Sequence, residues 1–543
     1  DMGVNYSRGI YLIVLSDASL ESILRDDATG DFIQFKKTQG YDVEIISMEG
    51  FGEAGYNLHI QLRQFLNNYY MQNPLLEYVL LVGDVDGSYS IPAFSVASYS
   101  YDEIDITDHT YTFIDDDPLT PNFFIGRWSI RTEDELEKIK SRSIGYVTMN
   151  LPGTDPPYPL NTSYLNNALM VAGNYGDTFF PVTPVWTSQW LMDELYNYGY
   201  SQVDTAFWQL GDQDENPMIE NKWNEGVGLI GYRGWGGATG WAYPDFRNSD
   251  LEALENIWKL PVVFSYVCNT GDFNRSGGDH CFAEKALTVG SPGSPTGAVA
   301  VVGPSDKDTD TKFNNPMYGT MMDALLEKRI PELAPALHAG KQCLIKEFGD
   351  LLAPSIYGFD GTYAEFYHYV YNVLGDPSLP VWLGEPQNMI TNLSEGDTLT
   401  SSHISINITN DAGEPLMDVV GALIEGNELI ENGLSNAEGE LVIDFDGLSI
   451  GLNLELYLNK AQYYQKKIDL HYESDDGEVA PQIDYRLVSD DVSYLYTFID
   501  SESDNTLTYN WIEIKEIGAN LNLTDDSVTS DLDLGFEFRY YGI

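Results

Sequence analysis

The sequences GVGLIGYRGWGGATGW, from Gly226 to Trp241, and LPVVFSYVCNTGDF, from Leu260 to Phe273, decide the fold of this chain. Each is an apolar run that ends in a small polar turn, which is typical of a buried parallel strand. The second run delivers Cys268 to the carboxyl end of its strand, where a glycine-containing turn follows. In open α/β sheets ligands bind at that edge. The pattern therefore predicts two neighbouring strands whose following turns, at Trp235 and at Cys268, share one site.

An α/β pattern extends over the chain up to about Leu383, where short apolar β runs alternate with amphipathic stretches. This alternation predicts parallel sheets that are covered by helices on both faces. A proline-rich break at 150–163 divides the pattern into lobes at 1–152 and 153–383. The predicted strands lie at 11–16, 43–48, 78–84, 123–130, 168–173 and 297–305, and the predicted helices lie at 59–70, from a Thr132–Glu135 capping box onward, at 189–198 and around 249–258.

Beyond Leu383 the hydrophobic pattern changes to period two, with turns of Gly, Asn and Asp between the runs. This pattern predicts an immunoglobulin-like β-sandwich over 384–473. After an acidic linker, a further β segment at 477–543 stops in mid-pattern, so we expect the natural protein to continue beyond Ile543. The predicted fold class is thus α/β, a two-lobed α/β/α region followed by a β-sandwich and a partial further β domain.

Composition excludes several classes of partner. The chain has 84 acidic and 28 basic residues, for a formal net charge of -56, and this charge repels nucleic acid and anionic membranes. No apolar stretch reaches the ~18 residues of a membrane span, so we expect no membrane insertion. Three cysteines do not make a disulfide framework. The acidity has two interpretations: a strongly solvated exterior, or carboxylates that gather divalent cations such as calcium.

Several sequence blocks, taken together in order and spacing, resemble the gingipain family of secreted cysteine peptidases. The resemblance covers most of 8–475 and implies a caspase-like topology, cysteine endopeptidase activity on peptides or proteins, and a secreted or cell-surface location. The blocks are YVLLVGD at 78–84, FFIGRWS at 123–129, CNTGDF at 268–273, CFAEKAL at 281–287, GAVAVVGPS at 297–305 and LGDPSLPVW at 374–382.

The resemblance transfers the catalytic positions unevenly. Cys268 matches the nucleophile of the family, although a buried strand cysteine is the plainer interpretation. Trp235 stands where the family has its general-base histidine, and Tyr175 stands where it has the carboxylate that orients this histidine. An indole ring has no nitrogen that can accept a proton from a thiol. Trp235 and Tyr175 either fill the former cleft or form an aromatic surface that binds a peptide or glycan.

A substitute base would have to come from elsewhere in the chain. His280 follows Cys268 by twelve positions, and it is either such a base or a loop histidine beside a helix start. The family residue that selects a basic substrate side chain falls near Pro184, so the resemblance carries over no arginine or lysine specificity.

A second candidate site is acidic. Asp84 ends a predicted parallel strand, and a loop with Asp115, Asp116 and Asp117 and then Asn122 precedes the FFIGRWS strand. Calcium prefers six to eight such oxygen ligands, and the resemblance implies calcium here with Asp84, Asp115, Asp117 and Asn122 as ligands. The alternative is a solvated acidic loop.

Two functions follow from the sequence. One is a secreted gingipain-like cysteine endopeptidase that uses Cys268 with an unconventional base. The other is a pseudo-peptidase that serves as a cell-surface, structural or adhesive protein, with partners at the cell surface or in self-assembly. The resemblance favours the first function, and the chemistry of Trp235 favours the second.

Overall fold

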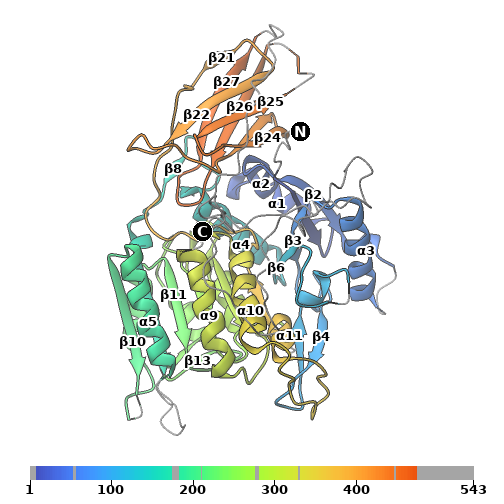
Figure 1. Ribbon diagram of the computed structural model, residues 1–543, viewed down its shortest axis with the longest axis vertical. Coiled ribbons are helices and arrows are strands. Elements are labelled where there is room, and N and C mark those ends of the chain that lie inside the picture. Colours follow the sequence, from blue (N-terminus) through green and yellow to red (C-terminus); the bar gives the residue numbers. More distant parts are fainter. Residues whose placement is uncertain are drawn as a thin grey trace, which may run out of the picture. The chain divides into compact units, whose positions relative to one another are not determined.

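Ten strands form one hydrogen-bonded sheet, in the order β10-β9-β11-β15-β18-β19-β6-β3-β1-β2 (Figure 1). The computed structural model describes residues 8–473 except 53–56, 116, 174–182, 210, 276–279, 328–329, 446–447 and 450, so Tyr175 and the segment at 477–543 lie outside the described residues. The strands of this sheet are β1 (Ile10–Leu15), β2 (Asp42–Ser47), β3 (Leu76–Val82), β6 (Phe124–Trp128), β9 (Asn167–Gly173), β10 (Gln202–Trp208), β11 (Leu229–Arg233), β15 (Val262–Ser265), β18 (Ala300–Pro304) and β19 (Tyr371–Leu374).

The direction of β19 decides how the two halves of the sheet meet. It runs antiparallel to β18 and parallel to β6, whereas the pairings within each half are parallel. The carboxyl ends of β11, β15 and β18 therefore lie at the opposite edge of the sheet from the carboxyl ends of β1 and β3. The α/β fold class is confirmed, and the two predicted lobes contribute to one continuous sheet.

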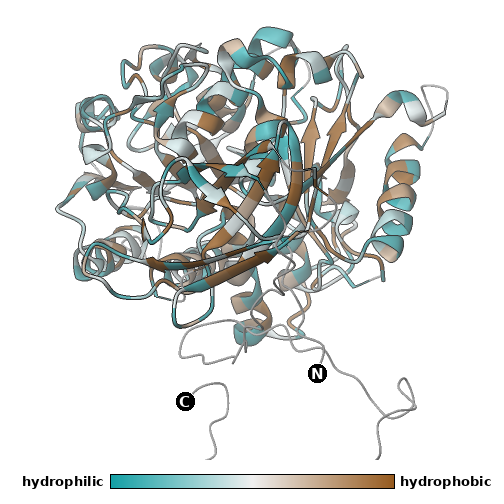
Figure 2. Cartoon of the chain, turned by 90° about the horizontal axis from the view of Figure 1, so that it is seen from above, coloured by the Kyte–Doolittle hydropathy of each residue, from teal (hydrophilic) through white to brown (hydrophobic). Residues whose placement is uncertain are grey.

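Both faces of the sheet are covered, as the unbroken apolar strands predict. In β1, Tyr11, Ile13 and Leu15 join the main hydrophobic core. The alternating residues Ile10, Leu12 and Val14 join a second core under the helix at Leu58–Gln72. Figure 2 shows that the strands are mostly apolar, whereas polar and apolar residues alternate along the helices around them.

The helices begin and end close to the predicted places, with two informative differences. The helix α4 (Glu133–Thr148) begins after Thr132, whose hydroxyl accepts from the Glu135 N–H at 3.3 Å, as predicted. The Glu135 carboxylate also accepts from the Arg131 N–H at 2.7 Å, one residue before the predicted partner. The helix predicted around 249–258 is only α7 (Asn248–Glu252), and the same crossover also contains a β-hairpin of Trp235–Gly237 and Gly240–Ala242.

The remaining helices complete the two layers. Their bounds are α1 (Leu20–Leu24), α2 (Phe32–Thr38), α3 (Leu58–Gln72), α5 (Thr183–Tyr198), α6 (Pro217–Glu225), α8 (Phe282–Thr288), α9 (Thr311–Leu326), α10 (Leu333–Phe348) and α11 (Tyr363–Val370). Among the described residues, none of these helices has the length and apolarity needed to cross a membrane.

A buried ion pair explains the Gly-Asp-Pro-Ser sequence that follows β19. Lys36 on α2 lies 2.6 Å from the Asp376 carboxylate, and both side chains are fully buried. Asp376 also accepts from the Tyr11 hydroxyl at 2.8 Å and from Ser378. The motif therefore joins the end of the α/β region to α2 on the far half of the sheet.

Beyond the α/β region the chain forms a β-sandwich with its own hydrophobic core. One sheet has the order β20-β22-β25, and the other has the order β21-β27-β26-β23-β24. The alternating burial of β22 confirms the period-two pattern from which the sandwich was predicted. The strands are β20 (Ile390–Thr391), β21 (Asp397–Leu399), β22 (His403–Thr409), β23 (Val420–Glu425), β24 (Glu428–Leu434), β25 (Glu440–Asp444), β26 (Leu452–Asn459) and β27 (Lys466–Tyr472).

Candidate active site

The turns that follow β11 and β15 lie side by side, as the sequence predicted. The two strands are parallel neighbours, with Leu229 opposite Val262. A Cβ atom added to Gly236 would lie 3.2 Å from the Cys268 carbonyl oxygen and 3.1 Å from the Val267 side chain. Because that space is too tight for an unadjusted side chain, glycine lets the Trp235 turn pack directly on the Cys268 turn.

In the Cys-Asn-Thr-Gly turn, Asn269 suits the backbone conformation and Gly271 suits the close approach to the next strand. Asn269 has a φ of 60°, a left-handed conformation that asparagine tolerates better than most residues. A Cβ added to Gly271 would lie 2.5 Å from the Gly303 carbonyl oxygen, so only glycine allows this approach to β18. The Gly271 N–H donates to the Pro304 carbonyl at 2.8 Å. The turn that carries Cys268 is thereby fixed against the end of the next strand.

The surroundings of the Cys268 thiol favour its protonated form. Burial raises its pKa most, and the negative charges of Asp308 and Asp306 raise it further, to about 11, although a hydrogen bond with Thr309 acts in the opposite direction. A nucleophilic cysteine normally has a lowered pKa, because a positive charge or a helix N-terminus stabilises the thiolate. Cys268 is a free thiol in a negative environment.

The Trp235 side chain is partly exposed rather than buried in a core. It is 40% exposed, and its ring meets the Tyr243 ring edge to face at a centroid distance of 5.5 Å. Tyr243 in turn packs on Trp208 at 4.8 Å. The Tyr232 hydroxyl lies 2.6 Å from the Trp235 carbonyl oxygen and holds the backbone of the turn. The Trp235 turn therefore packs on the Cys268 turn through Gly236, and the indole that it carries supplies no proton acceptor.

His280 is held by carboxylates on a different element. Its Nε2 lies 2.8 Å from Glu135 of α4, and its Nδ1 lies 3.6 Å from Glu284 of α8. Burial opposes a positive charge on His280, but the two carboxylates outweigh it and raise the pKa of His280 to about 9. The ring is thus an imidazolium in a local ion-pair network, and the groups that act most strongly on Cys268 come from 306–309 instead.

Three of the four residues expected to bind calcium have local partners. Asp84 is buried and forms an ion pair with Arg131 at 2.5 Å. Asp117 accepts from the Leu119 N–H and the Thr120 hydroxyl, both at 3.0 Å. Asn122 accepts from the Ile114 N–H at 2.9 Å, and Asp115 is exposed. Among the described acidic, histidine and cysteine side chains, these residues do not form a group of three that could share one ion.

A different acidic group lies beside the Cys268 turn. The carboxylates of Glu103, Asp105 and Asp306 bring one oxygen each to within 4.8 Å of one another. Burial and mutual repulsion raise the pKa values of Asp105 and Asp306. The sequence held a partial signal for this group, because Asp306 follows the third neighbouring strand at the edge where Cys268 lies. It held no signal that Glu103 and Asp105, two hundred residues earlier, would join it.

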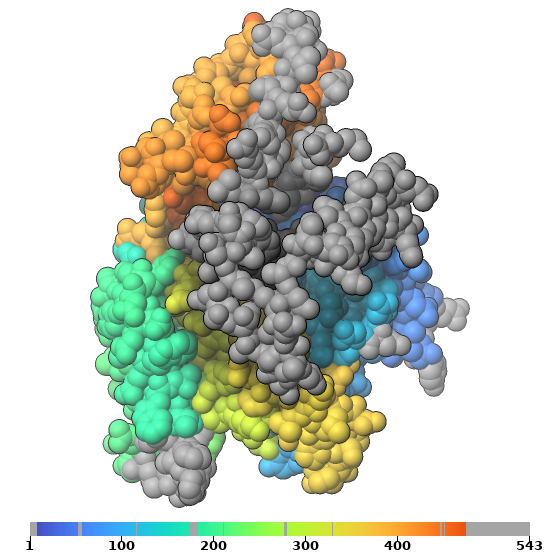
Figure 3. Space-filling view, in the orientation of Figure 1, coloured from blue at the N-terminus to red at the C-terminus, as the bar shows by residue number. Residues whose placement is uncertain are grey.

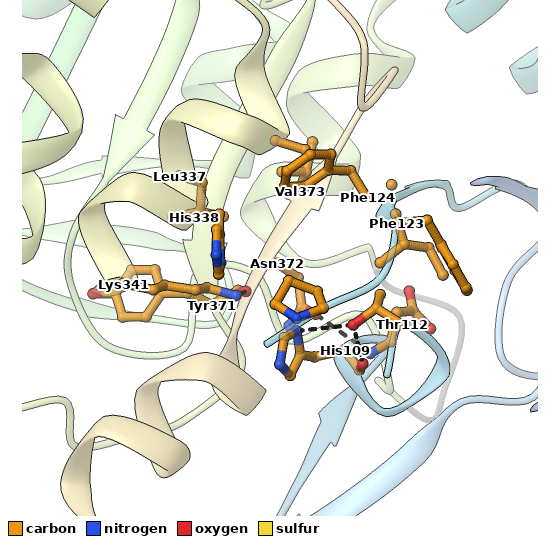
Figure 4. Close-up of a pocket in the computed structure, with 15 residues that line it drawn as sticks. His109, Thr112, Phe123, Phe124, Leu337, His338, Lys341, Tyr371, Asn372 and Val373 are labelled. Atoms are coloured by element: carbon orange, nitrogen blue, oxygen red, sulfur yellow. Dashed lines mark hydrogen bonds between the residues drawn. The ribbon is translucent and has the colours of Figure 1, made fainter. Parts of the chain in front are cut away.

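A small cavity with polar and apolar walls lies between β6, β19 and α10 (Figure 4). Its volume of about 40 Å³ has room for a few waters and not for a peptide. Lys341 lies beside it and donates to the carbonyls of His368 and Tyr371, both at 2.8 Å, while burial lowers the pKa of Lys341 to about 7. Burial and the Lys341 charge lower the pKa of His338 to about 4. The side chains of Lys341 and His338 therefore pack at the junction of the two half-sheets and stabilise it.

Aromatic side chains are exposed on α5, which forms part of the green surface in Figure 3. Trp186 is 59% exposed and Trp190 is 42% exposed, one helical turn apart. Pro184, where the family residue for basic substrates was expected to fall, lies in the first turn of this helix and is buried. That position therefore offers no charge to a substrate.

Comparison with known proteins relates this arrangement to a family. The profile of peptidase family C25 matches residues 6–382. Gingipain R1 of Porphyromonas gingivalis is 25% identical over 412 residues, which are 74% of this chain and 38% of that protein. Gingipain R2 of the same organism is 28% identical over 304 residues, which are 55% of this chain and 38% of that protein. The chain therefore spans well under half the length of these relatives.

Solved structures agree on the fold. The crystal structure of the Arg-specific cysteine proteinase gingipain R has a TM-score of 0.69 at 21% identity, and it covers 86% of this chain and 99% of its own. The complex of the Porphyromonas gingivalis RgpB pro- and mature domains has a TM-score of 0.69 at 20% identity, with 85% and 100% covered. These likenesses confirm the expected caspase-like α/β architecture.

Proposed function

This chain belongs to peptidase family C25, and we propose that it is a member that does not cleave peptides through Cys268. In this proposal the peptidase scaffold is retained as a protein that acts by binding, outside the cell or at the cell surface. The observation that carries the proposal is the environment of one thiol: burial and the charges of Asp308 and Asp306 raise the pKa of Cys268, whereas a cysteine peptidase needs an imidazole that lowers it.

The chemistry of amide cleavage explains why this environment matters. A base takes the proton of the thiol, the thiolate attacks the carbonyl carbon, and the protonated base then gives its proton to the leaving amine. The indole of Trp235 can neither accept the proton from the thiol nor return it to the amine. The Asp308 carboxylate is the charged group that acts most strongly on the thiol, but a carboxylate is a poor base for a thiol whose pKa is raised to about 11. His280 is engaged with Glu135 and Glu284.

A binding role draws on two features. The Trp235 indole is partly exposed at the edge where the family places its substrate, and it continues into a row of rings through Tyr243 to Trp208. Aromatic rings of this kind contribute large apolar area together with a polar handle and suit peptide or glycan ligands. The net charge of -56 favours a solvated exterior protein and disfavours nucleic acid as a partner.

The second candidate function is a cysteine endopeptidase with an unconventional base, and it is supported by the family and by the position of Cys268 at the strand end. Both candidates are tested by cleavage of casein and of a mixed fluorogenic peptide library by the parent chain and by Cys268→Ala. An active gingipain serves as the positive control.

We expect the parent and Cys268→Ala to show the same background rate. General acid–base catalysis alone contributes ~10²–10⁴-fold, so its loss leaves no measurable turnover. Cleavage by the parent that Cys268→Ala abolishes would contradict the proposal and establish the peptidase. In that case, loss of cleavage in His280→Ala would identify His280 as the base, acting after its imidazole leaves Glu135 and Glu284.

A further inference from the structure

Three carboxylates from two distant parts of the chain meet beside the Cys268 turn. Glu103 and Asp105 come from the hairpin β4–β5 (Phe94–Ala97 and Ile104–Thr107), and Asp306 follows β18. One oxygen atom of each lies within 4.8 Å of the others. Asp306 is fully buried, Asp105 is 4% exposed and Glu103 is half-buried. Burying charges of one sign together is costly unless a positive group lies among them.

The described protein groups do not supply enough positive charge here. Lys307 is the basic residue paired with Glu103, at 4.0 Å, and its side chain is mostly exposed. Asp306 accepts from the Ser98 hydroxyl at 3.0 Å, a neutral donor. The Oδ2 atom of Asp105 is buried and has no hydrogen-bond donor among the described residues. This unpartnered oxygen belongs to a carboxylate that lies within hydrogen-bonding reach of the Asp306 carboxylate.

Two carboxylate oxygens that approach this closely require a proton or a cation between them. A single shared proton would serve Asp105 and Asp306 but would leave Glu103, the third member, without a role. We propose that Glu103, Asp105 and Asp306 bind one calcium ion. All three ligands are hard carboxylate oxygens, which calcium and magnesium prefer over softer metals.

Calcium accommodates the full range of these separations, up to 4.8 Å, whereas magnesium does not. Oxygens on opposite sides of a calcium ion, each ~2.3–2.6 Å from it, lie up to ~5 Å apart, whereas magnesium at ~2.0–2.1 Å holds them to ~4.2 Å. The Ser98 hydroxyl and water can complete the coordination. The site would tie the β4–β5 hairpin to the end of β18, and the Asn269 N–H donates to the Asp306 carbonyl at 2.7 Å. Calcium would thereby stabilise the Cys268 turn, whether or not the chain is a peptidase.

Calcium titration of a purified, EGTA-treated chain tests this proposal by isothermal calorimetry and by thermal unfolding. The informative variant is Asp105→Asn, which keeps the shape of the side chain and removes the charge of its unpartnered oxygen. Asp115→Asn is the matched control: it removes one exposed charge from the other acidic loop, where calcium was expected from the family resemblance.

We expect calcium to raise the unfolding midpoint of the parent and of Asp115→Asn. Asp105→Asn should lose one equivalent of calcium or bind it at least ~10-fold more weakly, because calcium affinity depends on ligand charge. In EGTA, Asp105→Asn should unfold at or above the parent's midpoint, because the substitution relieves repulsion; this also shows that the variant is folded. Full calcium stoichiometry in Asp105→Asn, a response to magnesium alone, or no calcium binding by the parent would overturn the proposal.

Discussion

The reactivity of Cys268 toward an alkylating reagent is the sharpest consequence of the site. Its pKa is raised to about 11, mainly by burial and then by Asp308 and Asp306. At pH 7 a free thiol of pKa ~8.5 is ~3% thiolate, whereas one of pKa ~11 is ~0.01% thiolate, a difference of ~300-fold. The less acidic thiolate is intrinsically more nucleophilic by ~10-fold or slightly more. Cys268 should therefore react ~20–30-fold more slowly than a free thiol, before any steric hindrance.

Iodoacetamide labelling followed by peptide mass spectrometry measures this rate at each cysteine separately. Glutathione in the same solution is the reference thiol. We expect the rate at Cys268 to rise about tenfold for each pH unit from 7 to 10, without a plateau, because the thiolate fraction is still small throughout this range.

Two variants separate the local charges from the effect of burial. Asp308→Asn removes a negative neighbour of the thiol and should increase the rate at pH 8 by ~3–4-fold, because a pKa lower by about one unit gives ~10-fold more thiolate that is ~3-fold less nucleophilic. Glu347→Gln removes an exposed charge on α10 and should leave the rate unchanged. Labelling of Cys268 faster than glutathione at pH 7, or a plateau below pH 9, would refute the reasoning and indicate an activated thiolate.

Three further predictions concern stability. Because the pKa of His280 is raised to about 9, its ion pairs stabilise the folded state fully below pH 6.5, and this stabilisation is lost as the pH rises through 9. Urea unfolding should therefore show that the free energy of unfolding falls by up to ~3 kcal/mol between these pH values. In His280→Gln the free energy of unfolding should depend less on pH over this range. Asp376→Asn leaves the buried Lys36 ammonium without its carboxylate and should cost ~3–5 kcal/mol in denaturant unfolding; a loss below 1 kcal/mol would contradict the role of this pair. Gly236→Ala should cost ~1–3 kcal/mol because its Cβ meets the Cys268 turn, whereas Gly237→Ala, with open space around it, should show no such contact penalty.

The sequence was sufficient for the parts of the fold that local pattern controls. Unbroken apolar runs predicted buried parallel strands, and β1 shows why: both of its faces are covered. Period-two alternation predicted the β-sandwich, and the paired turns at Trp235 and Cys268 followed from two consecutive strands of one sheet. These features depend on neighbours in sequence or on the general rules of parallel sheets.

Other features required the tertiary structure, because they depend on residues that are far apart in the chain. The sequence did not show that β19 joins the two half-sheets, since four residues carry little pattern of their own. It did not show that His280 would meet Glu135, or that Asp306 would meet Asp105 from a hairpin two hundred residues earlier. The sequence by itself determined that the turn after the strand run of Gly226–Arg233 carries an indole, which cannot accept a proton, because this is a matter of residue identity. Only the tertiary structure decided that the Cys268 thiol is shielded from water and feels the charges of Asp308 and Asp306, because burial and the approach of these groups set its pKa.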